Sequence, residues 1–247
     1  MAGSIHICGN QRWRGAETRA LLLARDSSER SVVITAAGSD AVRRFAAAGV
    51  EAYAARLSGM FASINLSRLL RHAPEECRHI YVHSINVKDM VVKAVGMSGR
   101  KDLVVCADIP EPCYRPSSSA LTGPEPGGEP ILVWIGSINS GCGLDRLIET
   151  LGRLTHLPWR LRIVGEGESR EVMPLVRRAR ALQMDGRIEW IGYVHDVYSA
   201  MNGASYGIVC RDDPESSTVY KEFAAASFPV VFASDTELLF KRLSECL

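Results

Sequence analysis

Residues 131–164 read ILVWIGSINSGCGLDRLIETLGRLTHLPWRLRIV, and this stretch decides the fold class. An apolar run, Ile131–Ile135, leads through a glycine-rich turn into a helical pattern over Leu144–Leu154. A second apolar run, Trp159–Val164, follows. Short apolar runs of this length predict buried strands, and apolar residues three and four positions apart predict a helix. Strand, helix and strand in this order predict parallel strands joined by a crossover helix.

The same alternation extends in both directions from this stretch. Toward the C-terminus we expect helices at Glu171–Leu182, Val197–Asn202 and Thr218–Ser227, and strands at Arg187–Ile191, Tyr206–Cys210 and Pro229–Ala233. Toward the N-terminus we expect strands at Ser4–Cys8, Ser31–Thr35, Val50–Ala55, His79–His83 and Asp102–Ala107, with helices at Gly15–Arg25, Asp40–Ala48, Ala62–His72 and Val87–Met97. The pattern predicts an α/β protein with helices on both faces of parallel sheets.

A stretch rich in Pro, Gly and Ser separates the two halves. It predicts a linker over residues 116–130, between a first domain of residues 1–115 and a second of residues 131–247. We therefore expect two Rossmann-like domains facing each other across a cleft. Ligands of such sheets bind at the carboxyl ends of the strands, so the cleft is the expected binding site.

Bulk properties exclude several classes of protein. The 247 residues carry a net charge of +1, without the basic excess typical of nucleic-acid binders. The seven cysteines are scattered without CxxC spacing, which favours free thiols in a reducing cytoplasm over disulfides or zinc. The first residues lack a signal-peptide pattern, and no run of about 18 apolar residues occurs. A cytoplasmic protein is predicted, with peripheral contact at the inner membrane face and a homo-oligomer left open.

The glycine turns do not fit the common nucleotide fingerprints. The first turn carries Gly9 and Gly15, and the second carries Gly165 and Gly167, but Arg170 stands where GxGxxG requires its third glycine. The sequence also lacks GxxxxGK[ST]. Dinucleotide-dependent enzymes and P-loop ATPases are therefore disfavoured.

Four segments of the second half resemble the donor-binding half of glycosyltransferase family 4. They are ILVWIGSINSGCGLDRLIETLGRL from residue 131, WRLRIVGEGES from 159, RIEWIGYVHDVYSAMNGASYGIV from 187 and KEFAAASFPVV from 221. In the first half, RGAETRALLLAR from residue 14 is similar to the family's opening turn and first helix. The resemblance implies a compact GT-B fold and a retaining transferase that uses a UDP- or GDP-linked sugar as co-substrate, with no metal or other cofactor.

The resemblance also implies a donor site on the second domain. Its expected members are Gly136, Ser137, Cys142, Gly143, Gly165, Gly167 and Glu222. Glycine turns and a helix N-terminus supply amide N–H groups for a diphosphate, and a carboxylate holds ribose or sugar hydroxyls. The family's other glutamate lies eight positions before Glu222, where this chain has Pro214, so Glu215 is the nearest candidate for that catalytic role. Each of these glycines alone is explained equally well by a tight connection.

Three residues of the first domain are expected on the acceptor side or at a phosphate turn: Arg14, Gly15 and Glu17. Glu17 is equally explained as a first-turn residue favoured by the helix dipole. His83, at the end of a strand, resembles the family histidine that faces the reacting sugar and is the second catalytic candidate. A lone histidine at a strand end is as often a structural hydrogen-bonding residue.

Two departures from the pattern of glycosyltransferase family 4 leave open whether this chain is catalytically active. The resemblance implies cations where this chain has Ser137 and Cys142. Losing two charged hydrogen bonds of about 1.5–3 kcal/mol each weakens a diphosphate site unless other groups replace them. The chain also stops soon after Pro229–Ala233, as in a minimal enzyme, a truncated chain or a relative that no longer catalyses.

A glycosyltransferase acting with retention on a glycan or lipid-linked acceptor is the main hypothesis. The alternatives are a silent homologue that binds a partner protein and a sugar-nucleotide epimerase of the same fold.

Overall fold

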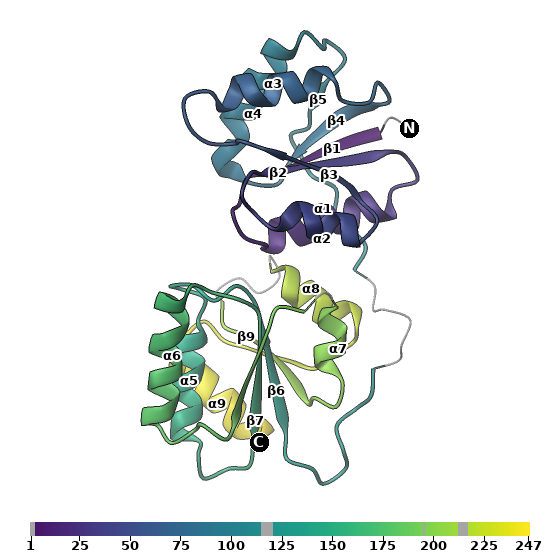
Figure 1. The fold of residues 1–247 in the computed structure, drawn as a ribbon. Helices are drawn as coiled ribbons and strands as arrows, with labels where there is room; N and C mark the ends of the chain where they lie inside the picture. The colour runs from purple at the N-terminus through teal and green to yellow at the C-terminus, as the bar shows by residue number, and fades with distance from the viewer. Residues whose placement is uncertain (1–2, 115–120, 195, 212–216) are drawn as a thin grey trace. The chain divides into compact units, whose positions relative to one another are not determined.

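The computed structural model describes residues 3–114, 121–194, 196–211 and 217–247. Strands and helices alternate along the chain (Figure 1). The chain separates into two compact units, Met1–Cys113 and Tyr114–Leu247, and each is described by itself. The linker residues 121–130 lie with the second unit: the amide of Thr122 donates to Asn202 Oδ1, and Leu121 packs beside Tyr198 and Met201.

The first unit is a parallel sheet with two helices on each face (Figure 1). Its strand order is β3-β2-β1-β4-β5, from β1 (Gly3–Cys8), β2 (Ser31–Ala36), β3 (Glu51–Ala55), β4 (Cys77–Val82) and β5 (Val104–Val105). The helices are α1 (Gly15–Asp26) and α2 (Ala41–Ala47) on one face, and α3 (Ala62–Arg71) and α4 (Lys88–Ser98), which follows the short helix η1 (Ile85–Val87), on the other.

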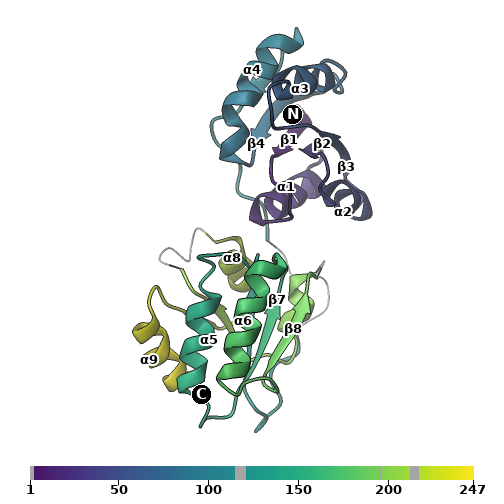
Figure 2. The ribbon, with the colours of Figure 1, turned by 60° about the vertical axis from the view of Figure 1, so that its left-hand side comes forward.

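The second unit repeats this topology. Its strand order is β10-β9-β6-β7-β8, from β6 (Ile131–Ile135), β7 (Arg160–Val164), β8 (Ile188–Gly192), β9 (Tyr206–Val209) and β10 (Val230–Phe232). One face carries α5 (Leu144–Arg153), α6 (Ser169–Ala181) and α9 (Thr236–Cys246), seen together in Figure 2. The other carries α7 (Val197–Met201) and α8 (Thr218–Ala225).

The prediction of two Rossmann-like α/β halves is confirmed. All neighbouring strands are parallel, and in each sheet the first strand of the half is central. The strand order therefore reverses at the β1/β4 pair in the first unit and at the β6/β9 pair in the second. Ligands of such sheets bind at this reversal, beyond the carboxyl ends of the strands. The expected cleft between the domains stays a prediction.

Burial on both faces explains why the strands read as nearly continuous apolar runs. In β1, Ile5 and Ile7 pack on the side of α3 and α4, whereas Cys8 packs on the side of α1 and α2. The second unit has its main core between the sheet and α5, where Leu147 and Leu151 are fully buried.

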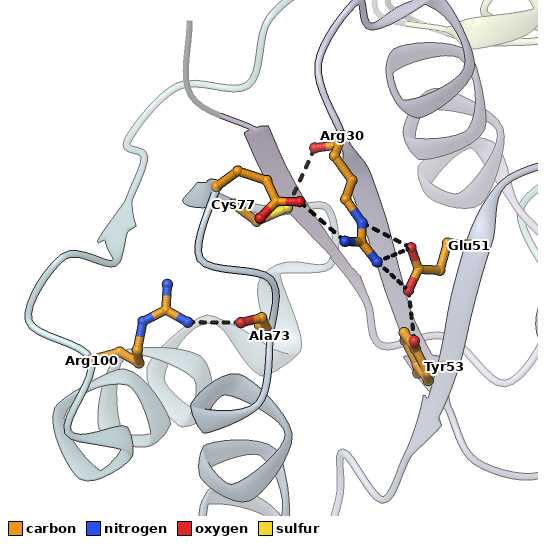
Figure 3. A network of polar contacts seen from close by, with 7 residues as sticks. Arg30, Glu51, Tyr53, Ala73, Cys77 and Arg100 are labelled. Carbon is orange, nitrogen blue, oxygen red and sulfur yellow. Dashed lines mark hydrogen bonds and ion pairs between the residues drawn. The ribbon is translucent and has the colours of Figure 1, made fainter.

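A polar network ties the amino ends of three strands in the first unit (Figure 3). The Arg30 guanidinium donates to Glu51 at 3.0 Å and to Glu76 at 3.1 Å, and the hydroxyl of Tyr53 donates to Glu51 at 2.6 Å. The Cys77 thiol donates to the Arg30 carbonyl at 3.4 Å. Exposed ion pairs contribute little stability, so we interpret this network as fixing strand register at the edge opposite the carboxyl ends.

The structure differs from the sequence predictions in two places. The strand expected at Asp102–Ala107 is only two residues long, because Asp102 is held in a turn by Arg100 and only Val104 and Val105 pair with β4. An additional helix, α9, follows the last predicted strand. It begins at a cap in which the Asp235 carboxylate accepts from the amide of Leu238 at 2.8 Å.

Candidate functional site

Two turns lie side by side at the carboxyl edge of the second sheet. The amide of Gly136, just beyond β6, donates to the Val164 carbonyl at 2.9 Å, and the amide of Ile138 donates to the Glu166 carbonyl at 2.8 Å. Ile138 also pairs with Gly167 in a parallel bridge. The turns after β6 and β7 thus continue the strand pairing beyond the sheet, and bring predicted donor-site glycines together.

Close backbone contacts require glycine at three of these positions. A Cβ on Gly165 would lie 1.8 Å from the Gly136 carbonyl oxygen, at a φ of +136°. A Cβ on Gly167 would lie 2.5 Å from the Ile138 carbonyl oxygen. At Gly143, with φ +80°, a Cβ would lie 2.4 Å from the Cβ of Cys210. Since real Cβ atoms do not approach this closely, any side chain here displaces the turns.

The turn after β6 delivers the chain into α5. Gly143 is the residue before the helix, and the amides of the first helical turn have no acceptor inside the helix. These amides and the helix dipole favour an anion at this end. Ser137 and Cys142 lie half-buried in the same turn, where the amide of Cys142 donates to the Asn139 carbonyl at 3.2 Å.

Two arginines that were not predicted as donor-site residues, Arg146 and Arg211, lie next to this turn or follow a residue that contacts it. Arg146, in the first turn of α5, donates to the carbonyl of Cys210 at 3.2 Å and to that of Ser234. It therefore joins the helix to the carboxyl ends of β9 and β10. Arg211 is exposed and follows Cys210, whose carbonyl oxygen lies against Gly143. Arg146 places positive charge beside this turn, and Arg211 is the next residue after Cys210. The resemblance implies cations at Ser137 and Cys142, which carry no charge.

Glu222 lies in the second turn of α8, next to β9. Its side chain is buried, at 6% exposure, and within the described residues its carboxyl group makes no hydrogen bond or ion pair. Burial raises the pKa of Glu222 to about 8, and the charge of Asp196 adds to the rise. Carboxyl groups whose pKa is raised this far by burial cluster at functional sites.

Glu215 and Pro214, which bear on the other catalytic role, lie outside the described residues. Within the described ranges, no group of three or more metal-ligating side chains comes together. None of the helices described is long and apolar enough to cross a membrane.

In the first unit, Arg14 and Gly15 lie exposed where α1 begins, whereas Glu17 is fully buried. The Glu17 carboxylate accepts from the Arg14 amide at 2.9 Å and from Asn10 Nδ2 at 3.0 Å. Burial raises the pKa of Glu17, and these hydrogen bonds oppose the rise. This geometry fits the interpretation of Glu17 as a helix-capping residue; contact with an acceptor stays a prediction.

His83 follows β4 directly, at the reversal of the first sheet. Its amide donates to the Ile7 carbonyl at 2.9 Å, and its Nε2 lies 2.9 Å from Nδ1 of His6. The neighbouring Ser84 hydroxyl accepts from the amide of Gly9 at 2.9 Å. Burial lowers the pKa of His83 to about 3, and the charges of His6 and Arg19 contribute. His83 is therefore neutral at pH 7. Its partner His6 was not predicted from the sequence.

Comparison with known proteins agrees with this description. Residues 129–239 match the family described as Glycosyl transferases group 1. No curated protein sequence matches the chain. Among solved structures, HepE of Anabaena in complex with UDP and glucose superimposes with a TM-score of 0.72 at 12% identity, over 98% of this chain and 89% of that one.

Two further structures share the fold. A glycosyltransferase from Rickettsia africae ESF-5 gives a TM-score of 0.64 at 11% identity, covering 99% of this chain and 88% of that one. The lipopolysaccharide outer core galactosyltransferase WaaB gives 0.54 at 13% identity, covering 93% and 80%. The chain has the GT-B fold, and its second unit carries the segment typical of group 1 glycosyl transferases. The resemblance seen in the sequence is confirmed.

Proposed function

We propose that this protein is a glycosyltransferase that moves a sugar from a nucleotide-sugar donor to a hydroxyl group of a glycan or lipid-linked acceptor, with retention. One observation carries the proposal: Glu222 is only 6% exposed, yet within the described residues its carboxyl oxygens make no hydrogen bond or ion pair and still reach the surface, beside the reversal of the second sheet. Hydroxyl groups of a ribose or sugar are suitable partners for these oxygens.

The diphosphate of the donor would lie against the turns after β6 and β7. Amides at the start of α5 and the glycine turns supply donors there. HepE, which shares the fold, was solved with UDP and with UDP-glucose, which supports a uridine nucleotide as the first one to test. A GDP-linked sugar is the second. Arg211 is exposed next to Cys210 and is a replacement for the cations absent at Ser137 and Cys142.

Chemically, the proposed reaction breaks the bond between the anomeric carbon and the donor phosphate and forms one to the acceptor oxygen. The acceptor proton leaves with the nucleotide diphosphate. A double displacement needs a carboxylate nucleophile at the anomeric carbon. The sequence suggests no carboxylate pair for that role, so attack from the side of the leaving group is our proposed route to retention.

Exposed apolar side chains of the first unit support a lipid-linked acceptor. Met60 and Phe61, between β3 and α3, are 89% and 60% exposed, and Ile85, just after β4, is 90% exposed. Both segments begin at carboxyl ends of strands, and apolar side chains as exposed as these are suited to insert into an apolar partner or a membrane interface. Replacing Met60 and Phe61 together by Ser should reduce co-sedimentation with phosphatidylglycerol vesicles several-fold. Met173→Ser, on α6, is the control, and equal binding of both variants contradicts this part of the proposal.

The donor assignment is tested by thermal unfolding with UDP-, GDP-, ADP- and CMP-linked nucleotides at millimolar concentration. A ligand that binds only the folded chain raises Tm. At a ligand concentration of a hundred times its Kd, the folded state is stabilised by about 2.7 kcal/mol. One nucleotide class should give this rise in the wild type and a smaller one in Glu222→Ala. Release of nucleotide that increases with an added acceptor then demonstrates transfer.

A silent homologue is the second candidate, and the uncharged Ser137 and Cys142 favour it. A partner-binding homologue predicts no rise in Tm with any nucleotide, whereas an epimerase predicts conversion of the nucleotide sugar without an acceptor. Thermal unfolding, nucleotide release and analysis of the sugar product together therefore separate the three functions.

A further inference from the structure

A series of buried and partly buried hydrogen bonds runs from β2 through β1 to His83, which follows β4. The Ser31 hydroxyl on β2 lies 2.9 Å from the Ser4 hydroxyl on β1, which lies 2.9 Å from His6 Nε2. His6 Nδ1 lies 2.9 Å from His83 Nε2. His6 pairs in register with Tyr81 of β4, and their rings are 5.4 Å apart. His6 is 1% exposed, so its polar atoms depend on these partners.

The direction of donation along this series of hydrogen bonds follows from its Ser31 end. The Ser31 hydroxyl reaches the Glu29 carbonyl oxygen at 3.5 Å, and a carbonyl can only accept. When Ser31 donates to that carbonyl, it accepts from Ser4, and Ser4 in turn accepts from His6 Nε2–H. His6 Nδ1 is then a lone pair and accepts from His83 Nε2–H. The opposite direction leaves the Glu29 carbonyl without this donor.

The environment of the other ring nitrogen agrees with this direction. His83 Nδ1 is buried and has no hydrogen-bond partner among the described residues. The positive charge of Arg19, which donates to the Ile109 carbonyl at 2.8 Å, acts on His83 and disfavours an additional proton. An unpaired acceptor beside a cation costs less than an unpaired N–H, because the cation attracts the lone pair. Both observations favour a proton on Nε2.

We infer that His6 is a positioning residue: supported by Ser4 and Ser31, it holds His83 in the Nε2–H tautomer and so keeps the Nδ1 lone pair as an acceptor for a hydrogen bond from a substrate hydroxyl. The inference about substrate rests on the proposed glycosyl transfer. The tautomer itself does not, because it is a property of the unliganded protein. Fixing a histidine tautomer through its second nitrogen is a common means of tuning its chemistry.

The first test is the tautomer of His83, measured at pH 7 by nitrogen-15 NMR of the histidine rings in the whole chain, with resonances assigned by single replacements. The wild type should show His83 as Nε2–H. His6→Leu removes the acceptor and should give a mixture of tautomers, whereas His6→Asn offers a carbonyl oxygen near the position of Nδ1 and should restore Nε2–H. An Nδ1–H form in the wild type, or an unchanged tautomer in His6→Leu, overturns the inference.

A substitution farther from His83, Ser31→Ala, keeps the tautomer testable if His6→Leu does not fold. Ser31→Ala removes the acceptor of the Ser4 hydroxyl, which can then donate to His6 Nε2 and reverse the series. We expect the Nδ1–H form of His83 to appear in Ser31→Ala while thermal unfolding remains close to that of the wild type. A tautomer that stays wholly Nε2–H in this variant contradicts the proposed series.

Turnover of the nucleotide sugar gives the second readout. The kcat of His6→Leu should fall by about 10- to 100-fold with KM nearly unchanged, as expected when a hydrogen bond made mainly in the transition state is lost, and His6→Asn should recover most of it. An altered tautomer with unchanged kcat overturns the catalytic part. If the wild type transfers no sugar, the proposed function fails while the NMR result for the tautomer stands by itself.

Discussion

Replacing Glu222 by Gln removes the one ionisable group on which the donor site depends most. A pKa of about 8, against the ordinary 4.5, means that the folded chain keeps this carboxyl group protonated where the unfolded chain has lost its proton. Stability is therefore lost as the pH rises from about 4.5 to about 8, and the loss is complete above that. At 1.36 kcal/mol per pH unit, the loss is about 3 kcal/mol at pH 7 and about 5 kcal/mol at pH 9.

Gln has nearly the same shape and does not titrate, so Glu222→Gln should lack this decline. Urea unfolding at pH 5, 7 and 9 measures the difference. Three of the four tryptophans, Trp134, Trp159 and Trp190, lie in the second unit, so fluorescence in a Trp13→Phe background reports that unit. The variant should match its parent at pH 5 and exceed it by about 5 kcal/mol at pH 9. A difference independent of pH would refute the reasoning.

The remaining predictions concern the turns. Gly165→Ala should destabilise the second unit by more than about 3 kcal/mol in urea unfolding, whereas Gly203→Ala, also at positive φ but with nothing within 4 Å of its Cβ, should cost about 1 kcal/mol; equal costs would contradict the close-contact argument. Cys142→Lys should tighten UDP binding by about 10-fold in titration calorimetry and Cys142→Met should not, because a charged hydrogen bond adds about 1.5–3 kcal/mol. Equal affinities in these two variants would place the diphosphate elsewhere.

Most of the fold could be predicted from the sequence because buried parallel strands produce apolar runs that need no partner to be recognised. Ile131–Ile135 matches β6 in both bounds. Helix α9 was missed although its signal is present: Asp235 is a good N-cap, and Leu239 and Leu243 lie four apart and are buried.

The site was less predictable because its decisive contacts join residues far apart in the chain. Arg146 is an ordinary helical residue until its carbonyl partners, Cys210 and Ser234, are brought beside it by β9 and β10. His6 lies within an apolar run and looks like part of a strand. Its role depends on strand register, which places it beside β4, and register cannot be read from spacing alone.

The central claim is that the second unit binds the nucleotide part of a sugar donor through Glu222 and the adjoining turns. Titration calorimetry of UDP-glucose and GDP-mannose at pH 7.5, into the wild type and Glu222→Ala, tests it most directly. We predict saturable one-to-one binding of one donor to the wild type, and affinity about 10-fold lower in the variant with its fold intact, since removing one partner of a buried hydrogen bond costs about 1–3 kcal/mol. Binding of neither donor, or equal affinity in both proteins, would contradict it.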